Sequence, residues 1–395
     1  MIIYYLYIAV CVVGVTWVLI KGKYLLSPVT IFIGSNLLYC IGLFFAKKTY
    51  QGTIYLPLLK NDNVLFDVTL TSLLGIVGFL IFYLFNNNKA QVYTASSRYV
   101  VRTMPAYCIL FPLAAILIIL GPSYGWHAMT HDRIVEVSFA TTLYAYIKYA
   151  FIVSSLLIIS PSPFSKKVVL MLFTLNVAVM LVDGARTTFL GFLIGYLFIL
   201  YRSGLRMKFS HSALILIALF CIPAARAIVL DGNDFWGNFI AGISAEATMG
   251  GYTALQGVDA TLHGGIMWGV SYVLDPIIYL LPREMREGNL YFFNHVFNYL
   301  YGEDFSPLGG FFYISEAYSN FSIFGGFIIA GIYGYILRKF ESCSGKFFYI
   351  SLMFMATYGA TFAKVNFANE FKIFITFLIF SFVFKKIILK KIPSL

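Results

Sequence analysis

Residues 65–85 read LFDVTLTSLLGIVGFLIFYLF, an almost unbroken apolar run in which Asp67 is the one charged residue. About 20 such residues are what a helix needs to cross a hydrocarbon core about 30 Å thick. The rest of the chain is similar: 60% of the 395 residues are hydrophobic and 11% are charged, whereas soluble domains are typically about 25% charged. The composition therefore predicts an all-α, polytopic integral membrane protein that forms a single domain over residues 1–395.

Further apolar stretches of comparable length predict about eleven transmembrane helices in all. They lie near residues 2–20, 25–45, 105–121, 139–160, 168–183, 187–201, 212–228, 319–337, 347–363 and 367–384. The first stretch lacks the basic start and the small-residue cleavage site of a secretory signal. We therefore expect it to be a retained span.

Basic residues concentrate on alternate connections between the predicted spans and at the C-terminus. Examples on this side are Lys166, Lys167, Arg338 and Lys385. The positive-inside rule then predicts a cytoplasmic C-terminus and an N-terminus on the outer side. With this topology, only Glu341 of the 17 acidic residues is cytoplasmic.

A long loop, residues 229–317, follows the eighth predicted span and lies on the outer side. Its apolar patches, 235–243 and 266–281, are short and flanked by charges, which favours interfacial or re-entrant helices. The loop is rich in ionisable residues, among them Glu246, His263, Arg283, Arg286, His295 and Glu316, and Arg226 stands at its entrance. Its aromatic residues could stack on sugar rings or form an interfacial belt.

Three basic residues outside this loop also stand out. Arg133 and Arg186 are predicted on the outer side, where each could bind an anion; Arg186 could instead pair with Asp183 and close a turn. Lys148 lies near the middle of a predicted span, where an unpaired charge costs roughly 3 kcal/mol or more. Lys148 should face a polar interior and could meet phosphate there, or it could extend toward the interface.

Two other classes of function fit the sequence poorly. The net charge of +11 comes from short basic clusters between apolar runs, as membrane topology requires, so nucleic acid is not an expected partner. The five cysteines lie in predicted spans or in a cytoplasmic turn, which argues against a disulfide framework or a zinc site. They are Cys11, Cys40, Cys108, Cys221 and Cys343.

Residues 309–321 read GGFFYISEAYSNF and are followed by Gly325, Gly326, Gly331 and Gly334 in the next predicted span. This region, the turn Gly184-Ala185-Arg186-Thr187 and the layout of spans and loop resemble bacterial O-antigen polymerases of the Wzy type. That family has an arginine followed after ten residues by glycine in one periplasmic loop, and after fifteen residues in another. Arg226 to Gly237 and Arg286 to Gly302 have these spacings, although here both lie in or beside one loop.

The resemblance implies a multi-pass glycosyltransferase of the bacterial inner membrane. Its N-terminus and active site would be periplasmic, and it would join undecaprenyl-diphosphate-linked oligosaccharide repeat units into polysaccharide. The growing chain would leave its lipid carrier and join the non-reducing end of an incoming unit. The expected partners are these lipid-linked units and the bilayer, and a chain-length regulator protein could be a further partner.

A single-displacement reaction needs positive charge around the departing diphosphate and a general base at the acceptor hydroxyl. We expect the arginines of the outer side to bind the diphosphate. They are Arg133, Arg186, Arg226, Arg283 and Arg286. The candidate bases are Glu246, His263, His295 and Glu316. Glu316 is expected about one turn above its helix, where it could act as the base or cap that helix.

No cofactor is expected, and metal independence is favoured because the loop has no DxD-like motif and arginines can stabilise the leaving group. Two alternatives stay open. An O-antigen ligase would attack the same linkage with lipid A core as the acceptor. A flippase for the lipid-linked oligosaccharide would require ionisable residues along a central pathway, whereas the predicted charges gather in the outer loop.

Overall fold

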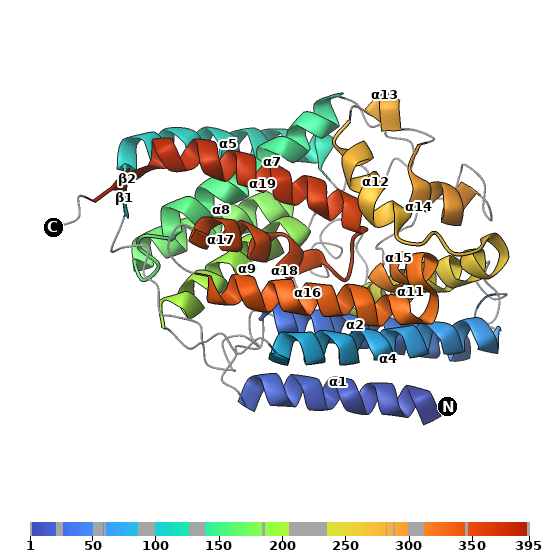
Figure 1. Ribbon diagram of the computed structural model, residues 1–395. Helices are drawn as coiled ribbons and strands as arrows, with labels where there is room; N and C mark the ends of the chain where they lie inside the picture. Colours follow the sequence, from blue (N-terminus) through green and yellow to red (C-terminus); the bar gives the residue numbers. More distant parts are fainter. Residues whose placement is uncertain are drawn as a thin grey trace.

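The computed structural model consists almost entirely of helices that lie side by side (Figure 1). It describes residues 2–20, 27–49, 58, 61–85, 99–125, 139–183, 186–204, 235–281, 283–286, 289–298, 312–343 and 347–392. The longer elements are α1 (Ile2–Ile20), α2 (Pro28–Thr49), α4 (Asp62–Phe85), α5 (Thr103–Tyr124), α7 (Phe139–Ile159), α8 (Lys166–Asp183), α9 (Arg186–Arg202), α11 (Phe235–Gly264), α16 (Gly325–Ser342) and α19 (Phe367–Ile388).

Shorter elements connect or interrupt these helices. They are α12 (Val270–Tyr279), α13 (Arg283–Arg286), α14 (Tyr291–Phe293), the π-helix η2 (Asn294–Asn298), α15 (Tyr313–Phe321), the 3-10 helix η3 (Ser322–Phe324), α17 (Phe348–Ala356) and α18 (Tyr358–Thr361). The start of α1 and the elements α11 to α15 lie at one end of the bundle, and the C-terminus lies at the other end (Figure 1).

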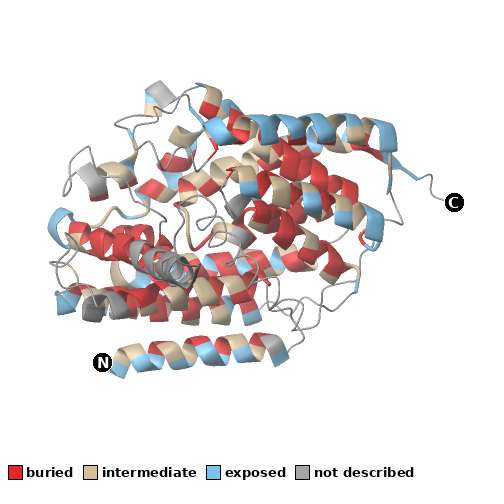
Figure 2. Cartoon of the chain, turned by 180° about the vertical axis from the view of Figure 1, so that it is seen from behind, coloured by how far each residue is buried: buried red, intermediate tan, exposed pale blue. Residues whose placement is uncertain are grey.

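Four described segments are long and apolar enough to cross a membrane, and this membrane-protein character agrees with the sequence prediction. They are Asp62–Phe85, Thr103–Tyr124, Phe139–Ile159 and the stretch Tyr313–Ser342. Buried residues line the inner faces of the helices, while outward faces such as that of α1 expose apolar side chains (Figure 2). The predicted span 212–228 lies outside the described residues.

Local sequence sets where several of these helices begin. α2 starts at Pro28, whose missing N–H costs nothing at the first helical position. The Ser27 hydroxyl accepts a hydrogen bond from the Thr30 N–H at 3.2 Å. At α4 the Asn61 side chain accepts a hydrogen bond from the Asn63 N–H at 3.2 Å, so both helices have side-chain caps for otherwise unpaired N–H groups.

Glycines bring α4 and α16 into close contact, which lipid-embedded helices use in place of a hydrophobic driving force. A Cβ at Gly326 would overlap the Thr71 carbonyl oxygen, and one at Gly334 would lie 2.6 Å from the Phe79 carbonyl oxygen. The glycine-rich stretch of α16 therefore has a packing role against α4.

The structure departs from the sequence predictions in several places. The predicted span at 347–363 is broken at Thr357 into α17 and α18. The patch at 235–243 is the first part of the 30-residue helix α11 and not a short interfacial segment. The predicted span at 319–337 is divided, since Ser322 has φ 53° and separates α15 from α16. Finally, the all-α prediction missed a strand pair, β1 (Tyr99–Val101) with β2 (Leu389–Lys391), antiparallel with Val100 opposite Lys390.

These differences have physical causes. α11 continues because small residues let it pack closely: a Cβ at Gly257 would overlap Ser315, so α11 and α15 lie in contact. The strands form because 99–101 and 389–391 extend from helix ends at the same end of the bundle, where each supplies the partner for the other's backbone groups.

Candidate functional site

Helix α12 turns its polar side chains inward and its apolar side chains outward. Ser271 and Asp275 are buried, whereas Val273 and Ile277 are 64% and 59% exposed. A helix on the surface of a soluble protein has the opposite arrangement. An exposed face of this kind fits contact with lipid, and the inward face contributes polar groups to the end of the bundle.

The Glu316 carboxylate joins three separate elements at this end. Its Oε1 accepts a hydrogen bond from the Ser271 hydroxyl of α12 at 3.1 Å, and its Oε2 accepts one from the Phe367 N–H at the start of α19 at 3.0 Å. The Asn320 side-chain amide donates to both the Glu316 carbonyl and the Ser271 hydroxyl at 2.8 Å. Glu316 is only 2% exposed.

This geometry changes the expectation for Glu316. The residue lies inside α15, not one turn above its helix, and it caps the N-terminus of α19, not that of its own helix. A carboxylate near a helix N-terminus is stabilised by the unpaired N–H groups and the helix dipole. Both oxygens are therefore engaged in holding α12, α15 and α19 together.

Asp275 lies one turn after Ser271 in α12 and has a role comparable to that of Glu316. Its two carboxylate oxygens accept hydrogen bonds from the N–H groups of Tyr291 at 2.8 Å and Phe292 at 3.0 Å, which begin α14. Burial raises the pKa of Asp275, and the two N–H donors oppose that shift. Asp275 thus positions α14 and the following π-helix relative to α12.

Arg286 of α13 and Lys372 of α19 each lie over a tyrosine ring. The Arg286 guanidinium lies 5.3 Å from the centre of the Tyr279 ring, and the Tyr279 hydroxyl is 3.4 Å from the Asn366 side-chain amide. The Lys372 ammonium lies 5.7 Å from the centre of the Tyr146 ring. The buried Arg286 Nε has no hydrogen-bond partner among the described residues.

His295 lies half-buried in the π-helix, against the end of α11. Its ring contacts Gly264 and forms a hydrogen bond with the Gly265 backbone. Its Nε2 is buried and has no hydrogen-bond partner in the described part of the chain. Burial lowers the pKa of His295, so the neutral imidazole, which can accept a proton, is favoured.

His263 is less well placed for chemistry than His295. Its side chain is 61% exposed, and its Nδ1 lies 2.8 Å from the Asp259 carbonyl oxygen and 3.8 Å from the Asp259 carboxylate. These are contacts within one helix turn of α11. His263 therefore belongs to an exposed helix surface.

The remaining predicted residues lie at the edge of the described structure or beyond it. Arg133 and Arg226, with its glycine spacing, are outside the described residues. Arg186, Glu246 and Arg283 have described backbones in α9, α11 and α13, but their side chains are outside the described part. Among the predicted residues with described side chains, Arg286 and Glu316 both act on the Tyr279 hydroxyl. The Arg286 charge lowers its pKa and the Glu316 charge raises it.

Lys148 has a partner that the sequence reasoning did not assign. Its ammonium lies 3.1 and 3.2 Å from the two Asp183 carboxylate oxygens and 5.2 Å from the centre of the Tyr144 ring. Asp183 is fully buried. The Asp183 carboxylate thus pairs across α7 and α8, and this compensates a lysine charge that would otherwise be costly in an apolar setting.

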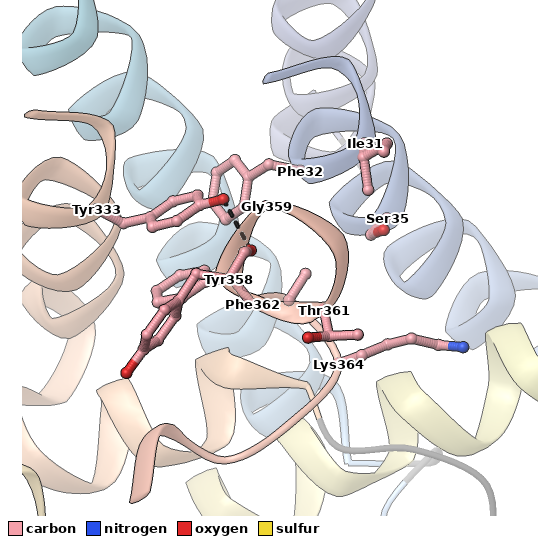
Figure 3. Close-up of a pocket in the computed structure, with 10 residues that line it drawn as sticks. Ile31, Phe32, Ser35, Tyr333, Tyr358, Gly359, Thr361, Phe362 and Lys364 are labelled. Atoms are coloured by element: carbon pink, nitrogen blue, oxygen red, sulfur yellow. Dashed lines mark hydrogen bonds between the residues drawn. The ribbon is translucent and has the colours of Figure 1, made fainter. Parts of the chain in front are cut away.

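Two hollows in the described part of the chain do not suit this chemistry. One, of about 10 Å³, lies beside the break between α17 and α18, where the Tyr333 hydroxyl donates to the Tyr358 carbonyl (Figure 3); it has room for about one water. The other, about 600 Å³ in volume, is an open groove on α4 and α16 lined by Phe82, Phe85, Phe327, Ile328, Ile332 and Tyr335.

Sequence reasoning missed Ser271 and Tyr279 as members of the site. Neither residue had a usable signal in the sequence. Among the described residues, no group of three or more His, Cys, Asp and Glu side chains could hold a metal ion. Comparisons of the chain with protein-family models, curated proteins and solved structures found no match.

Proposed function

We propose that this chain is a membrane glycosyltransferase that joins undecaprenyl-diphosphate-linked oligosaccharide units into polysaccharide, as its resemblance to O-antigen polymerases implies. The observation that carries the proposal is the position of Arg286. Its guanidinium, with Nε unpaired among the described residues, follows a helix whose apolar face is exposed. A substrate made of a lipid tail and a diphosphate needs an apolar surface and a cation side by side.

In this reaction the acceptor hydroxyl attacks the anomeric carbon of the growing chain, and the bond to the lipid diphosphate breaks. Arg286 would stabilise the negative charge that develops on the departing diphosphate. A guanidinium over a ring face keeps its N–H groups free at its edge, where they can donate to phosphate oxygens. We also propose that four further arginines bind this diphosphate: Arg133, Arg186, Arg226 and Arg283.

We assign the general base to His295 ahead of the other candidates. A base needs a free acceptor atom and must be in its neutral form at the working pH. The Nε2 of His295 has no partner among the described residues, and burial favours the neutral imidazole. Glu316 uses both oxygens for hydrogen bonds to Ser271 and Phe367, so we assign it a positioning role. The α11 to α15 end of the bundle would face the periplasm.

The test uses the full chain in nanodiscs with a defined undecaprenyl-diphosphate-linked repeat unit, with and without chelator. Wild type should produce a ladder of products, and Arg286→Ala should reduce ladder formation by at least about a hundredfold, the usual loss for one transition-state charge donor. Arg338→Ala is the matched control, because the Arg338 guanidinium also lies over a ring, at 5.5 Å from the centre of Tyr83, in the last part of α16.

The outcomes separate the proposal from its alternatives. A single transfer to lipid A core without a ladder would indicate a ligase. Movement of the lipid-linked unit across the bilayer without any transfer would indicate a flippase. Full-length ladders from Arg286→Ala would remove Arg286 from the reaction, and in cells that variant should leave lipopolysaccharide with a single repeat.

A further inference from the structure

Glu370, in the first turn of α19, is a buried carboxyl group with one described hydrogen-bond partner. It is 2% exposed, and its Oε1 lies 2.6 Å from the Thr361 hydroxyl oxygen of α18. Its Oε2 is buried and has no hydrogen-bond partner among the described residues. By contrast, Glu316 and Asp275 each accept two hydrogen bonds. Because a buried carboxylate is costly without such donors, the ionised form of Glu370 is disfavoured.

Tyrosines face this part of α19 and supply no counter-charge. The Tyr358 ring of α18 lies 6.2 and 5.8 Å, between centres, from the phenylalanine rings one turn before and one turn after Glu370. Tyr149 of α7 lies 5.6 Å from a phenylalanine two turns further along. Tyr333 of α16 donates its hydroxyl to the Tyr358 carbonyl, and Tyr279 of α12 lies at the start of α19. Tyrosine hydroxyls are neutral near pH 7.

The charged side chains closest along the chain to Glu370 are engaged elsewhere. Lys372 lies over the Tyr146 ring, and residues two positions apart on a helix do not face each other. Glu316 accepts the Phe367 N–H and already compensates the positive end of α19. Within the described part of the chain Glu370 forms no ion pair. An ionised Glu370 would therefore add a second negative charge at this helix end without a counter-charge.

The Thr361 hydroxyl lies between Glu370 and the break that separates α17 from α18. Its oxygen is 2.6 Å from the Glu370 Oε1 and 3.1 Å from the Thr357 carbonyl oxygen, but a hydroxyl has one hydrogen to donate. If Glu370 carries a proton, its O–H donates to Thr361 and the Thr361 hydroxyl donates to the Thr357 carbonyl. Both contacts are then hydrogen bonds, and each strengthens the other.

Thr361 also connects Glu370 to a hollow. It lines the space of about 10 Å³ beside the helix break, which has room for about one water (Figure 3). Lys364 lines the same hollow, and its ammonium extends away from the Thr361 hydroxyl (Figure 3). A water in the hollow could exchange a proton with Glu370 through Thr361, which would donate one hydrogen and accept another.

We propose that Glu370 is a proton-binding site inside the bundle, a carboxylic acid at neutral pH that donates to Thr361 and exchanges its proton with water in the hollow. Deprotonation moves one proton to that water and leaves a carboxylate. Protonatable carboxyl groups in membrane interiors and at broken helices are the groups with which membrane proteins relay or couple protons. The site does not rest on the proposed function, which uses His295 as the base.

Infrared spectroscopy tests the protonation directly. The full chain would be purified in dodecyl maltoside, which has no ester carbonyl to mask the signal. At neutral pH the wild-type spectrum should contain the C=O band of a protonated carboxylic acid, and Glu370→Gln should lose it. Glu341→Gln is the matched control and should keep the band, because Glu341 is also buried but accepts from the Tyr83 hydroxyl and lies 3.6 Å from the Arg338 guanidinium.

Two further variants test the assignment and the exchange route. Glu370→Asp retains a carboxyl group and should shift the band without removing it, which identifies the residue even if Glu370→Gln does not fold. Thr361→Val removes the hydroxyl at nearly constant volume. It should move the band to higher wavenumber and slow its shift in D2O, whereas Thr361→Ser should leave both unchanged.

Several results would overturn the proposal. The first, which needs no variant, is a wild-type spectrum without an acid band at neutral pH. The others are a band that persists in Glu370→Gln, an equal loss in Glu341→Gln, or a band that Glu370→Asp does not move. An unchanged band position and exchange rate in Thr361→Val would overturn the route through Thr361.

Discussion

Replacing Glu316 distinguishes a residue that positions three helices from one that takes a proton. Its carboxylate accepts hydrogen bonds from the Ser271 hydroxyl and the Phe367 N–H. Hydrogen bonds to a charged group are worth about 1.5–3 kcal/mol each, so Glu316→Ala should lower the free energy of unfolding by about 3–6 kcal/mol. In Glu316→Gln the side-chain oxygen can still accept from the Phe367 N–H, and the side-chain amide can donate to the Ser271 hydroxyl. These neutral hydrogen bonds contribute about 0.5–1.5 kcal/mol each, so the free energy of unfolding should fall less than in Glu316→Ala.

The assay combines equilibrium unfolding in mixed micelles with ladder formation by the same protein preparations. If Glu316 is a positioning residue, Glu316→Gln should keep most of the activity and Glu316→Ala should lose it together with stability. Glu341→Gln is the control, since Glu341 is also buried and accepts a hydrogen bond from the Tyr83 hydroxyl in the last turn of α16. A stable Glu316→Gln protein without any activity would refute the reasoning and restore Glu316 as the base.

Further predictions concern charge pairing, pH and helix contact. Lys148→Met should destabilise the protein by about 3–5 kcal/mol because it leaves Asp183 buried without that partner, and Lys148→Met/Asp183→Asn should recover most of the loss in the same unfolding assay. Burial lowers the pKa of His295 below its ordinary value of 6.5, so the unfolded chain binds more protons than the folded protein near that pH. The unfolding temperature should therefore fall as pH drops below about 6.5. His295→Gln should flatten this pH dependence in thermal scans at several pH values. Gly326→Ala should force α16 away from the Thr71 carbonyl and lower the unfolding temperature, while an unchanged temperature would contradict this close packing.

The roles of the acidic residues show where sequence reasoning stopped. Their concentration on the outer side suggested a set of candidate proton acceptors near a diphosphate site. In the structure Glu316 caps α19, Asp275 caps α14, and Asp183 pairs with Lys148. A buried carboxylate needs such partners to be stable, so these three residues hold helices together.

Hydropathy predicted most helices well because a lipid-facing helix satisfies its backbone hydrogen bonds internally, and its apolar side chains are a local property of the chain. α5, α7, α8 and α9 therefore lie close to their predicted bounds. The length of α11 was not predictable in this way, since its second half depends on glycines that contact other helices.

By itself, the sequence determined a helical membrane protein, the ranges of its longer helices and the charged composition of the loop. Only the tertiary structure decided which charges meet. Lys148 lies far from Asp183 in the chain, and the packing of α7 against α8 brings the two charges to 3.1 Å. Local sequence encodes apolar faces and helix caps, but pairing between distant side chains depends on how helices pack, which no short stretch of residues specifies.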